Sequence, residues 1–138
     1  MTTAIRLDNL RKSFAGKPAL HGVSFEVQRG EIFGLLGHNG AGKSTLIDAI
    51  AGEIHLDGGQ VTISGQALAG LSVSQQSRLR AVLPQKPSLS FDLTVTEVAE
   101  MGAYPFPDAS PSVVNEWVAQ SLGWADLTDL APRRYLTL

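Results

Sequence analysis

A glycine-rich segment at residues 37–44 constrains the fold of this 138-residue chain more than any other feature. The segment reads Gly-His-Asn-Gly-Ala-Gly-Lys-Ser and follows a continuous apolar run at 32–36, which predicts a short strand buried on both faces. From Lys43 onward the apolar residues recur at helical spacing, and Gly52 stands where such a helix would end. The order of strand, glycine loop and helix therefore predicts an α/β fold.

The segment matches the pattern G-x-x-x-x-G-K-S/T, whose residue types suit the capture of a phosphate chain. Gly37, Gly40 and Gly42 allow successive backbone N–H groups to turn inward, and the following helix adds the positive end of its dipole. Lys43 would neutralise the terminal phosphates, and the Ser44 hydroxyl would bind Mg²⁺. The loop is thus predicted to bind a magnesium nucleoside triphosphate.

The predicted binding residues comprise the whole loop and the residue after it. Thr45 is expected to support the inner phosphate, whereas His38 is interpreted as a solvent-side residue with no catalytic part. The three histidines of the chain show no metal-ligand spacing, so neither a zinc site nor His-based catalysis is predicted. The residues assigned to the nucleotide are Gly37, His38, Asn39, Gly40, Ala41, Gly42, Lys43, Ser44 and Thr45.

The composition excludes several other classes of protein. The chain has 43% hydrophobic and 17% charged residues, as globular domains do, and its formal net charge of -2 argues against a general nucleic-acid binder. The pairs Arg11–Lys12 and Arg133–Arg134 are interpreted as solvated surface charges. There is no Cys, which fits a reducing compartment, and no apolar stretch approaches the ~20 residues of a membrane span. Any association with a membrane is therefore expected to come through a partner.

The remaining pattern predicts strands around the loop and helices farther along the chain. The expected strands are 4–10, 23–27, 60–63 and 81–83, with a polar helix at 72–80. Thr94 and Glu97 fit a capping box for a short helix that Gly102 would close. Ser110 and a following proline predict the start of another helix, which would end at Gly123.

The loop and its surroundings closely resemble the nucleotide-binding subunit of ABC transporters, over the whole chain. The resemblance lies in residues 37–45, in Gly30-Glu31-Ile32 before them, and in Leu83-Pro84-Gln85 after them. It implies an α/β P-loop NTPase fold of the ABC ATPase type, incomplete in these residues. Residues 1–91 would form a partial, β-rich ATP-binding core with the Walker A loop, its helix and the Q-loop. Residues 92–138 would form part of the helical subdomain.

The resemblance also assigns residues outside the loop. In this family an aromatic side chain upstream of the loop stacks on adenine, and Phe14 occupies the matching position. Gln85 matches the Q-loop glutamine, which contacts Mg²⁺ and the attacking water. The resemblance therefore implies catalytic roles for Lys43 and Gln85, with Ser44 and Gln85 as the metal ligands.

Two segments, 92–98 and 101–105, are similar to the subgroup that powers uptake of iron-siderophore, heme and cobalamin compounds. The residues at 81–85 and 93–95 are most similar to those of hemin importers. The resemblance implies ATP and Mg²⁺ as cofactors, a homodimer of ATP-binding subunits, transmembrane permease subunits and, indirectly, a periplasmic substrate-binding protein. Nucleic acid is not an expected partner. Such a subunit would lie on the cytoplasmic face of the inner membrane, without a signal peptide or a transmembrane segment.

Several motifs of the family are not found in these residues. The signature loop, Leu-Ser-Gly-Gly-Glu or similar, would come directly after 134–138, and the acidic Walker B strand, its adjoining glutamate and the switch histidine are also absent. We expect the 138 residues to be part of a longer ATPase and to bind ATP with negligible hydrolysis, because the general base is lacking. The strand expected at 32–36 would expose an apolar edge, which favours association with another chain.

Other functions remain open at the level of the sequence. A siderophore or cobalamin importer ATPase fits the same subgroup, and a non-transport ABC ATPase or a nucleotide-binding regulatory fragment would carry the same loop. The helical stretch 92–130 favours a transporter, because in this family it forms the surface that meets the membrane subunit. A small GTPase or a kinase is disfavoured, since no guanine-reading Asn-Lys-x-Asp pattern occurs.

Overall fold

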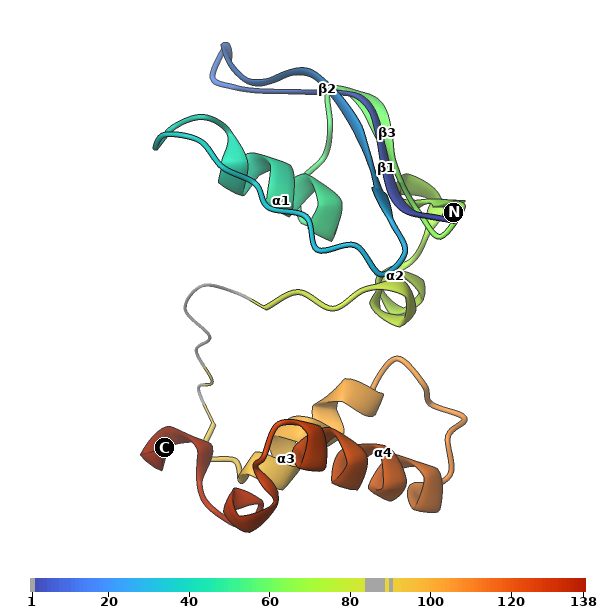
Figure 1. Ribbon diagram of the computed structural model, residues 1–138, viewed down its shortest axis with the longest axis vertical. Helices are drawn as coiled ribbons and strands as arrows, with labels where there is room; N and C mark the ends of the chain where they lie inside the picture. The colour runs from blue at the N-terminus through green and yellow to red at the C-terminus, as the bar shows by residue number, and fades with distance from the viewer. Residues whose placement is uncertain (1, 84–88, 90) are drawn as a thin grey trace. The chain divides into compact units, whose positions relative to one another are not determined.

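The computed structural model describes residues 2–83, 89 and 91–138, and these divide into two compact units (Figure 1). The first unit is Met1–Val82 and the second is Leu83–Leu138. The division expected from the sequence, between residues 91 and 92, falls inside the second unit. Each unit has its own buried core.

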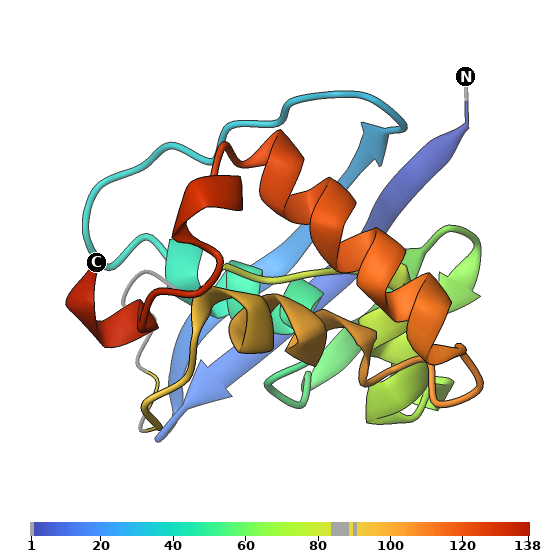
Figure 2. The ribbon, with the colours of Figure 1, turned by 90° about the horizontal axis from the view of Figure 1, so that it is seen from below.

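The first unit is built on a four-stranded antiparallel sheet. Its strands are β1 (Thr3–Phe14), β2 (Lys17–Gln28), β3 (Gly58–Ile63) and β4 (Gln66–Ala67), in the spatial order β2-β1-β3-β4. The arrowheads of β1 and β2 point in opposite directions in Figure 2, as a hairpin requires. A turn with positive φ at Ala15 and Gly16 joins these two strands. The strands expected at 4–10, 23–27 and 60–63 are thereby confirmed, the first two within longer strands.

Helix α1 (Lys43–Ala51) lies over one face of this sheet (Figure 1). Its Leu46 and Ala49 are buried against leucines and β-branched residues of the strands, which explains the helical spacing of apolar residues in the sequence. The helix ends at Gly52, which has a φ of 72° and donates its N–H to the carbonyl oxygens of Asp48 and Ala49. The predicted end of this helix is confirmed.

The C-terminal end of α1 is tied to the segment that follows α2 (Val73–Leu79). The guanidinium of Arg80 donates to the carbonyl oxygen of Ala51 and, at 2.9 Å, to the side-chain oxygen of Gln76. Gln76 in turn donates to the carbonyl oxygen of Leu71 at 3.0 Å. A cation at this end of a helix also interacts favourably with the helix dipole. Arg80 therefore links the C-terminal end of α1, the helix that follows the glycine loop, to α2.

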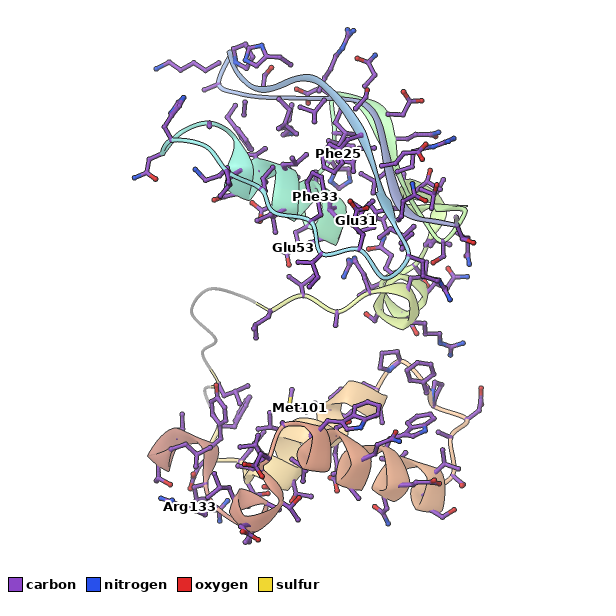
Figure 3. All side chains as sticks on the ribbon, in the orientation of Figure 1. Phe25, Glu31, Phe33, Glu53, Met101 and Arg133 are labelled. Atoms are coloured by element: carbon purple, nitrogen blue, oxygen red, sulfur yellow. The ribbon has the colours of Figure 1, made fainter. Side chains whose placement is uncertain are left out.

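The prediction of a strand at 32–36 is wrong. This segment is irregular, and Ile32 and Leu36 are 99% and 94% exposed. The ring of Phe33 stacks on that of Phe25 in β2, with centroids 4.8 Å apart and planes 11° apart, which holds the segment beside the sheet (Figure 3). A strand needs a neighbour to complete its hydrogen bonds, and none of the strands in the described residues pairs with this segment. The short strand expected at 81–83 is irregular for the same reason.

The second unit is helical, as expected. Helices α3 (Val95–Glu100) and α4 (Pro111–Trp124) pack through a small core of Val95, Val118 and Leu122. This unit also has short 3-10 turns, η2 (Met101–Ala103), η3 (Thr128–Leu130) and η4 (Tyr135–Thr137). The first unit has a turn of the same type, η1 (Leu68–Gly70). No helix in the described part of the chain has the length and apolar character needed to cross a membrane.

The capping box at the start of α3 is confirmed. The backbone N–H of Thr94 donates to the Glu97 carboxylate at 2.7 Å, and the Glu97 N–H donates to the Thr94 hydroxyl at 3.2 Å. The Thr94 N–H and, at 2.8 Å, the Thr94 hydroxyl both donate to the Glu97 carboxylate and lower the pKa of Glu97 below its ordinary value of 4.5. The capping box therefore favours the folded state at neutral pH, and this contribution is lost as the pH falls through the lowered pKa.

Of the three boundary predictions in this unit, the start of α4 is confirmed and the other two are wrong. Gly102 does not end α3. It lies inside the 3-10 turn η2, and the C-cap residue of α3 is Met101. Ser110 precedes α4 as expected, yet its hydroxyl shares a hydrogen bond with that of Ser112 at 3.0 Å and does not cap the helix. Helix α4 also continues past Gly123, because that glycine keeps helical geometry.

Candidate functional site: a phosphate-binding loop

The loop before α1 is shaped by two glycines with left-handed backbone. Gly40 has a φ of 83° and Gly42, the N-cap residue of α1, has a φ of 80°. No side chain caps this end of the helix, so the first backbone N–H groups of α1 are open toward the loop. An open helix N-terminus behind a glycine-rich turn is a favourable environment for an anion.

Gly42 is also required by close packing. A Cβ atom built there would lie 2.5 Å from the carbonyl oxygen of Ala19 in β2, far inside van der Waals contact. The loop therefore meets the sheet at a point where only glycine fits. Gly40 has nearly the same φ, but a Cβ atom there would have no neighbour within 4 Å.

Lys43 turns back over the loop that precedes it. Its ammonium donates to the carbonyl oxygen of Gly37 and, at 2.7 Å, to that of His38. The full positive charge is thereby held at the same end of α1 as the open N–H groups. The His38 ring is exposed and its Nδ1 lies 2.9 Å from the carbonyl oxygen of Asn39, so it points to no acid or base.

These elements enclose a pocket of about 380 Å³. Its polar lining residues are Asn39, Lys43, Ser44 and Thr45. None of the described residues that line the pocket is acidic, which suits an anionic ligand and leaves these residues without a carboxylate as general base. The lining residues are Ala19, Asn39, Gly40, Gly42, Lys43, Ser44 and Thr45.

Most residues assigned to the nucleotide from the sequence come together here. Gly37 and His38 hold the lysine through their carbonyl oxygens, and Ala41 donates its N–H to the His38 carbonyl at 3.2 Å within the turn. Ala19 was not expected at the site, because nothing in the sequence shows which residue of β2 meets the loop. Gln85 lies outside the described residues.

Phe14 is the last residue of β1 and its side chain is 49% exposed. It does not line the pocket, but it pairs with Lys17 of β2, two residues before Ala19. Lys12 was interpreted from the sequence as a solvated surface charge, and this is wrong. Its side chain is 16% exposed, and its ammonium lies 5.2 Å from the centroid of the Phe14 ring.

The first unit has another cavity, of about 400 Å³, at the opposite end of α1. It is bounded by residues such as Ile54, Leu56, Val61 and Leu68, and the lining residues that the structure describes include no lysine or arginine. Among the described residues there is also no cluster of three or more His, Cys, Asp or Glu side chains that could hold a metal ion by itself. A divalent cation would therefore need oxygens from its ligand in addition to a hydroxyl such as that of Ser44.

An antiparallel sheet, a glycine loop and an open helix N-terminus around an anion pocket define a phosphate-binding α/β domain of the P-loop class. The family described as ABC transporter matches residues 20–137. The chain belongs to this family, and its fold is that of the ABC ATPase type.

Curated relatives match nearly all of this chain over about half of their own length. The hemin import ATP-binding protein of Bordetella pertussis is 53% identical over 127 residues, which cover 92% of this chain and 48% of the relative. The protein of the same name from Pseudomonas fluorescens is 40% identical over 134 residues, covering 97% of this chain and 52% of the relative. The chain thus spans about half the length of the curated relatives it matches.

Solved structures support the same fold. A nucleotide-free ATP-binding cassette from an ABC transporter has a TM-score of 0.78 at 27% identity, covering 99% of this chain and 59% of that one. An ATP-binding subunit of an ABC transporter has a TM-score of 0.83 at 27% identity, covering 98% and 55% respectively.

Replacing Gly42 with alanine is expected to weaken MgATP binding more than tenfold, equivalent to about 1.4 kcal/mol. The new Cβ would collide with the Ala19 carbonyl and move the end of α1 away from the loop. Gly40→Ala is the matched control, since it adds the same left-handed strain without a collision and should change affinity by less than about threefold. Isothermal titration calorimetry measures both, and equal losses in the two variants would contradict the packing argument.

Proposed function

We propose that this chain binds ATP with Mg²⁺ on loop 37–45 and is the ATP-binding part of an ABC importer ATPase for hemin or a related iron compound. The observation that carries the proposal is the position of Lys43, whose ammonium is held by the Gly37 and His38 carbonyls at the open end of α1. The relatives named hemin import ATP-binding proteins support the cargo.

The residues at the pocket suit each part of the ligand. Backbone N–H groups at the start of α1 and the Lys43 ammonium would bind the outer phosphates. The Ser44 hydroxyl would be the protein ligand of Mg²⁺, which neutralises phosphate charge when it is bound, and the Thr45 hydroxyl would support the inner phosphate. The half-exposed ring of Phe14 would stack on adenine, by analogy with base stacking worth ~1–3 kcal/mol. Gln85 is assigned to Mg²⁺ and water by resemblance alone.

The pocket supports binding better than hydrolysis. The lining residues in the described part of the chain provide a lysine and hydroxyls but no carboxylate to accept a proton from an attacking water. We therefore propose that these 138 residues bind ATP with negligible turnover. Hydrolysis would belong to a complete subunit that pairs with a second ATP-binding subunit and drives transmembrane permease subunits from the cytoplasmic face of the membrane.

Calorimetry on the 138-residue chain tests the binding proposal. MgATP and magnesium tripolyphosphate are expected to bind, AMP is expected to bind far more weakly, and phosphate release from ATP should not exceed the uncatalysed background. Equal affinity for AMP and ATP would contradict a phosphate-binding role for the loop. Steady ATP turnover by the purified chain would contradict the proposed lack of a general base.

Growth of the source organism tests the cargo. Deletion of the gene is expected to abolish growth on hemin as the sole iron source while growth on ferrous salts continues. Undiminished growth on hemin, with loss of growth on a siderophore or of cobalamin uptake, would assign a different cargo to the same ATPase.

A further inference from the structure

The tip of the β1–β2 hairpin is held by an acidic side chain from a distant part of the sequence. One oxygen of the Asp57 carboxylate accepts the backbone N–H of Ser13 at 2.7 Å, and the other lies 3.5 Å from the Lys12 ammonium. The Asp57 N–H also donates to the carbonyl oxygen of Arg11 at 2.9 Å. Asp57 thus contacts three consecutive residues of β1 just before Phe14.

Lys12 links this carboxylate to the aromatic ring. Its ammonium lies 5.2 Å from the Phe14 centroid, within the ~6 Å range of a cation–π contact. Since only 16% of the Lys12 side chain is exposed, the contact is shielded from water and its strength is raised accordingly. One face of the ring is therefore engaged by a cation, while the side chain as a whole stays about half exposed.

This arrangement has two consequences for a purine that stacks on Phe14. The ring stands next to the Ala15–Gly16 turn, and its contact with Lys12, which Asp57 holds in turn, fixes its position before a ligand arrives, which lowers the entropic cost of stacking. A cation on one face also draws electron density away from the other, and an electron-rich purine is better received by an electron-poor face.

The hairpin also connects the ring to the phosphate pocket. Phe14 pairs with Lys17, and Ala19, two residues farther along β2, lines the pocket. At ~3.3 Å per residue, the two positions are ~7 Å apart along one strand. A shift of the hairpin tip would therefore move the ring relative to the phosphates.

We propose that Lys12 and Asp57 are positioning residues for base recognition, which hold Phe14 with one face on the Lys12 ammonium so that its other face receives the adenine of ATP. This proposal rests on the proposed function, in which Phe14 stacks on the base. It predicts that the pair contributes to the affinity for the base and not to the affinity for the phosphates.

The test compares dissociation constants of MgATP and magnesium tripolyphosphate, which lacks a base, on the whole protein. Lys12→Gln is expected to weaken MgATP binding about fivefold and to leave tripolyphosphate binding within twofold, because a shielded cation–π contact of this size is lost. Asp57→Ala should have the same pattern, and Lys12→Arg should restore the affinity for MgATP. Lys17→Gln removes the same charge beside Phe14 and should leave the ratio of the two constants unchanged.

Phe14→Leu separates failure of this proposal from failure of the proposed function. If Phe14→Leu leaves the ratio of the two constants unchanged, the base does not stack on Phe14 and both proposals are wrong. If Phe14→Leu lowers the relative affinity for ATP but Lys12→Gln does not, only the positioning role is wrong. An equal loss of both ligands in Lys12→Gln would show a general structural role and would also overturn it. When Phe14 is already leucine, Lys12→Gln should have no further effect.

Discussion

Replacing Lys43 with alanine is expected to reduce the affinity for MgATP at least about 100-fold, which corresponds to ~2.7 kcal/mol. Charge-assisted hydrogen bonds contribute ~1.5–3 kcal/mol each, and the Lys43 ammonium lies where it could make more than one with the terminal phosphates. Among the described residues that line the pocket there is no other lysine or arginine to take its place.

The same substitution should leave the fold intact. Lys43 is the first residue of α1, its hydrogen bonds in the protein go only to loop carbonyls, and alanine has high helix propensity. Urea unfolding is expected to give a free energy within about 0.5 kcal/mol of the unsubstituted protein. Lys17→Ala removes an equal charge outside the pocket and controls for net charge. Tight MgATP binding by the Lys43→Ala variant would remove the assignment of the site.

The glycine loop could be predicted because its determinants are contiguous. Gly40, Gly42 and Lys43 act on the backbone and space immediately around them, so the sequence alone locates both the helix start and the charge. The capping box of Thr94 and Glu97 is local for the same reason. Both features could be predicted because the residues that determine each of them lie close together in the sequence.

The apolar run at 32–36 shows why other predictions failed. An apolar run indicates only that its side chains favour burial, whereas a strand also needs a neighbouring strand for its backbone hydrogen bonds. In the described residues that neighbour is absent, and Phe33 finds its contact on Phe25 instead. The pattern of side chains could not reveal the missing partner.

Lys12 shows the corresponding limit at the site. Its carboxylate partner, Asp57, is 45 residues away and becomes a neighbour only because β3 begins at Gly58 and pairs with β1. In the sequence the lysine looks like any surface charge. Its contact with Asp57 depends on the register of the sheet, which alternation alone leaves undetermined.

That register depends on Gly59, and Gly59→Ala is expected to destabilise the protein by more than about 3 kcal/mol. Gly59 has a φ of 82°, and a Cβ atom there would lie 2.4 Å from the carbonyl oxygens of both Asp8 and Asn9. These atoms belong to the backbone of β1 at a bulge, where the pairing with β3 shifts between Asp8 and Arg11. Backbone cannot rotate away as a side chain can, so the two strands must separate at this point.

Gly65→Ala distinguishes this collision from simple backbone strain. Gly65 has a φ of 80°, almost that of Gly59, but a Cβ atom there would have no neighbour within 4 Å. Its substitution should cost only the ~1–2 kcal/mol of a left-handed alanine. Urea unfolding followed by circular dichroism measures the free energy of unfolding of both variants. Similar losses of stability would mean that the backbone at the bulge shifts at little cost to accommodate the new Cβ. Because Asp57 lies two residues before Gly59, a Gly59→Ala protein that still folds should also lose part of its preference for MgATP over tripolyphosphate.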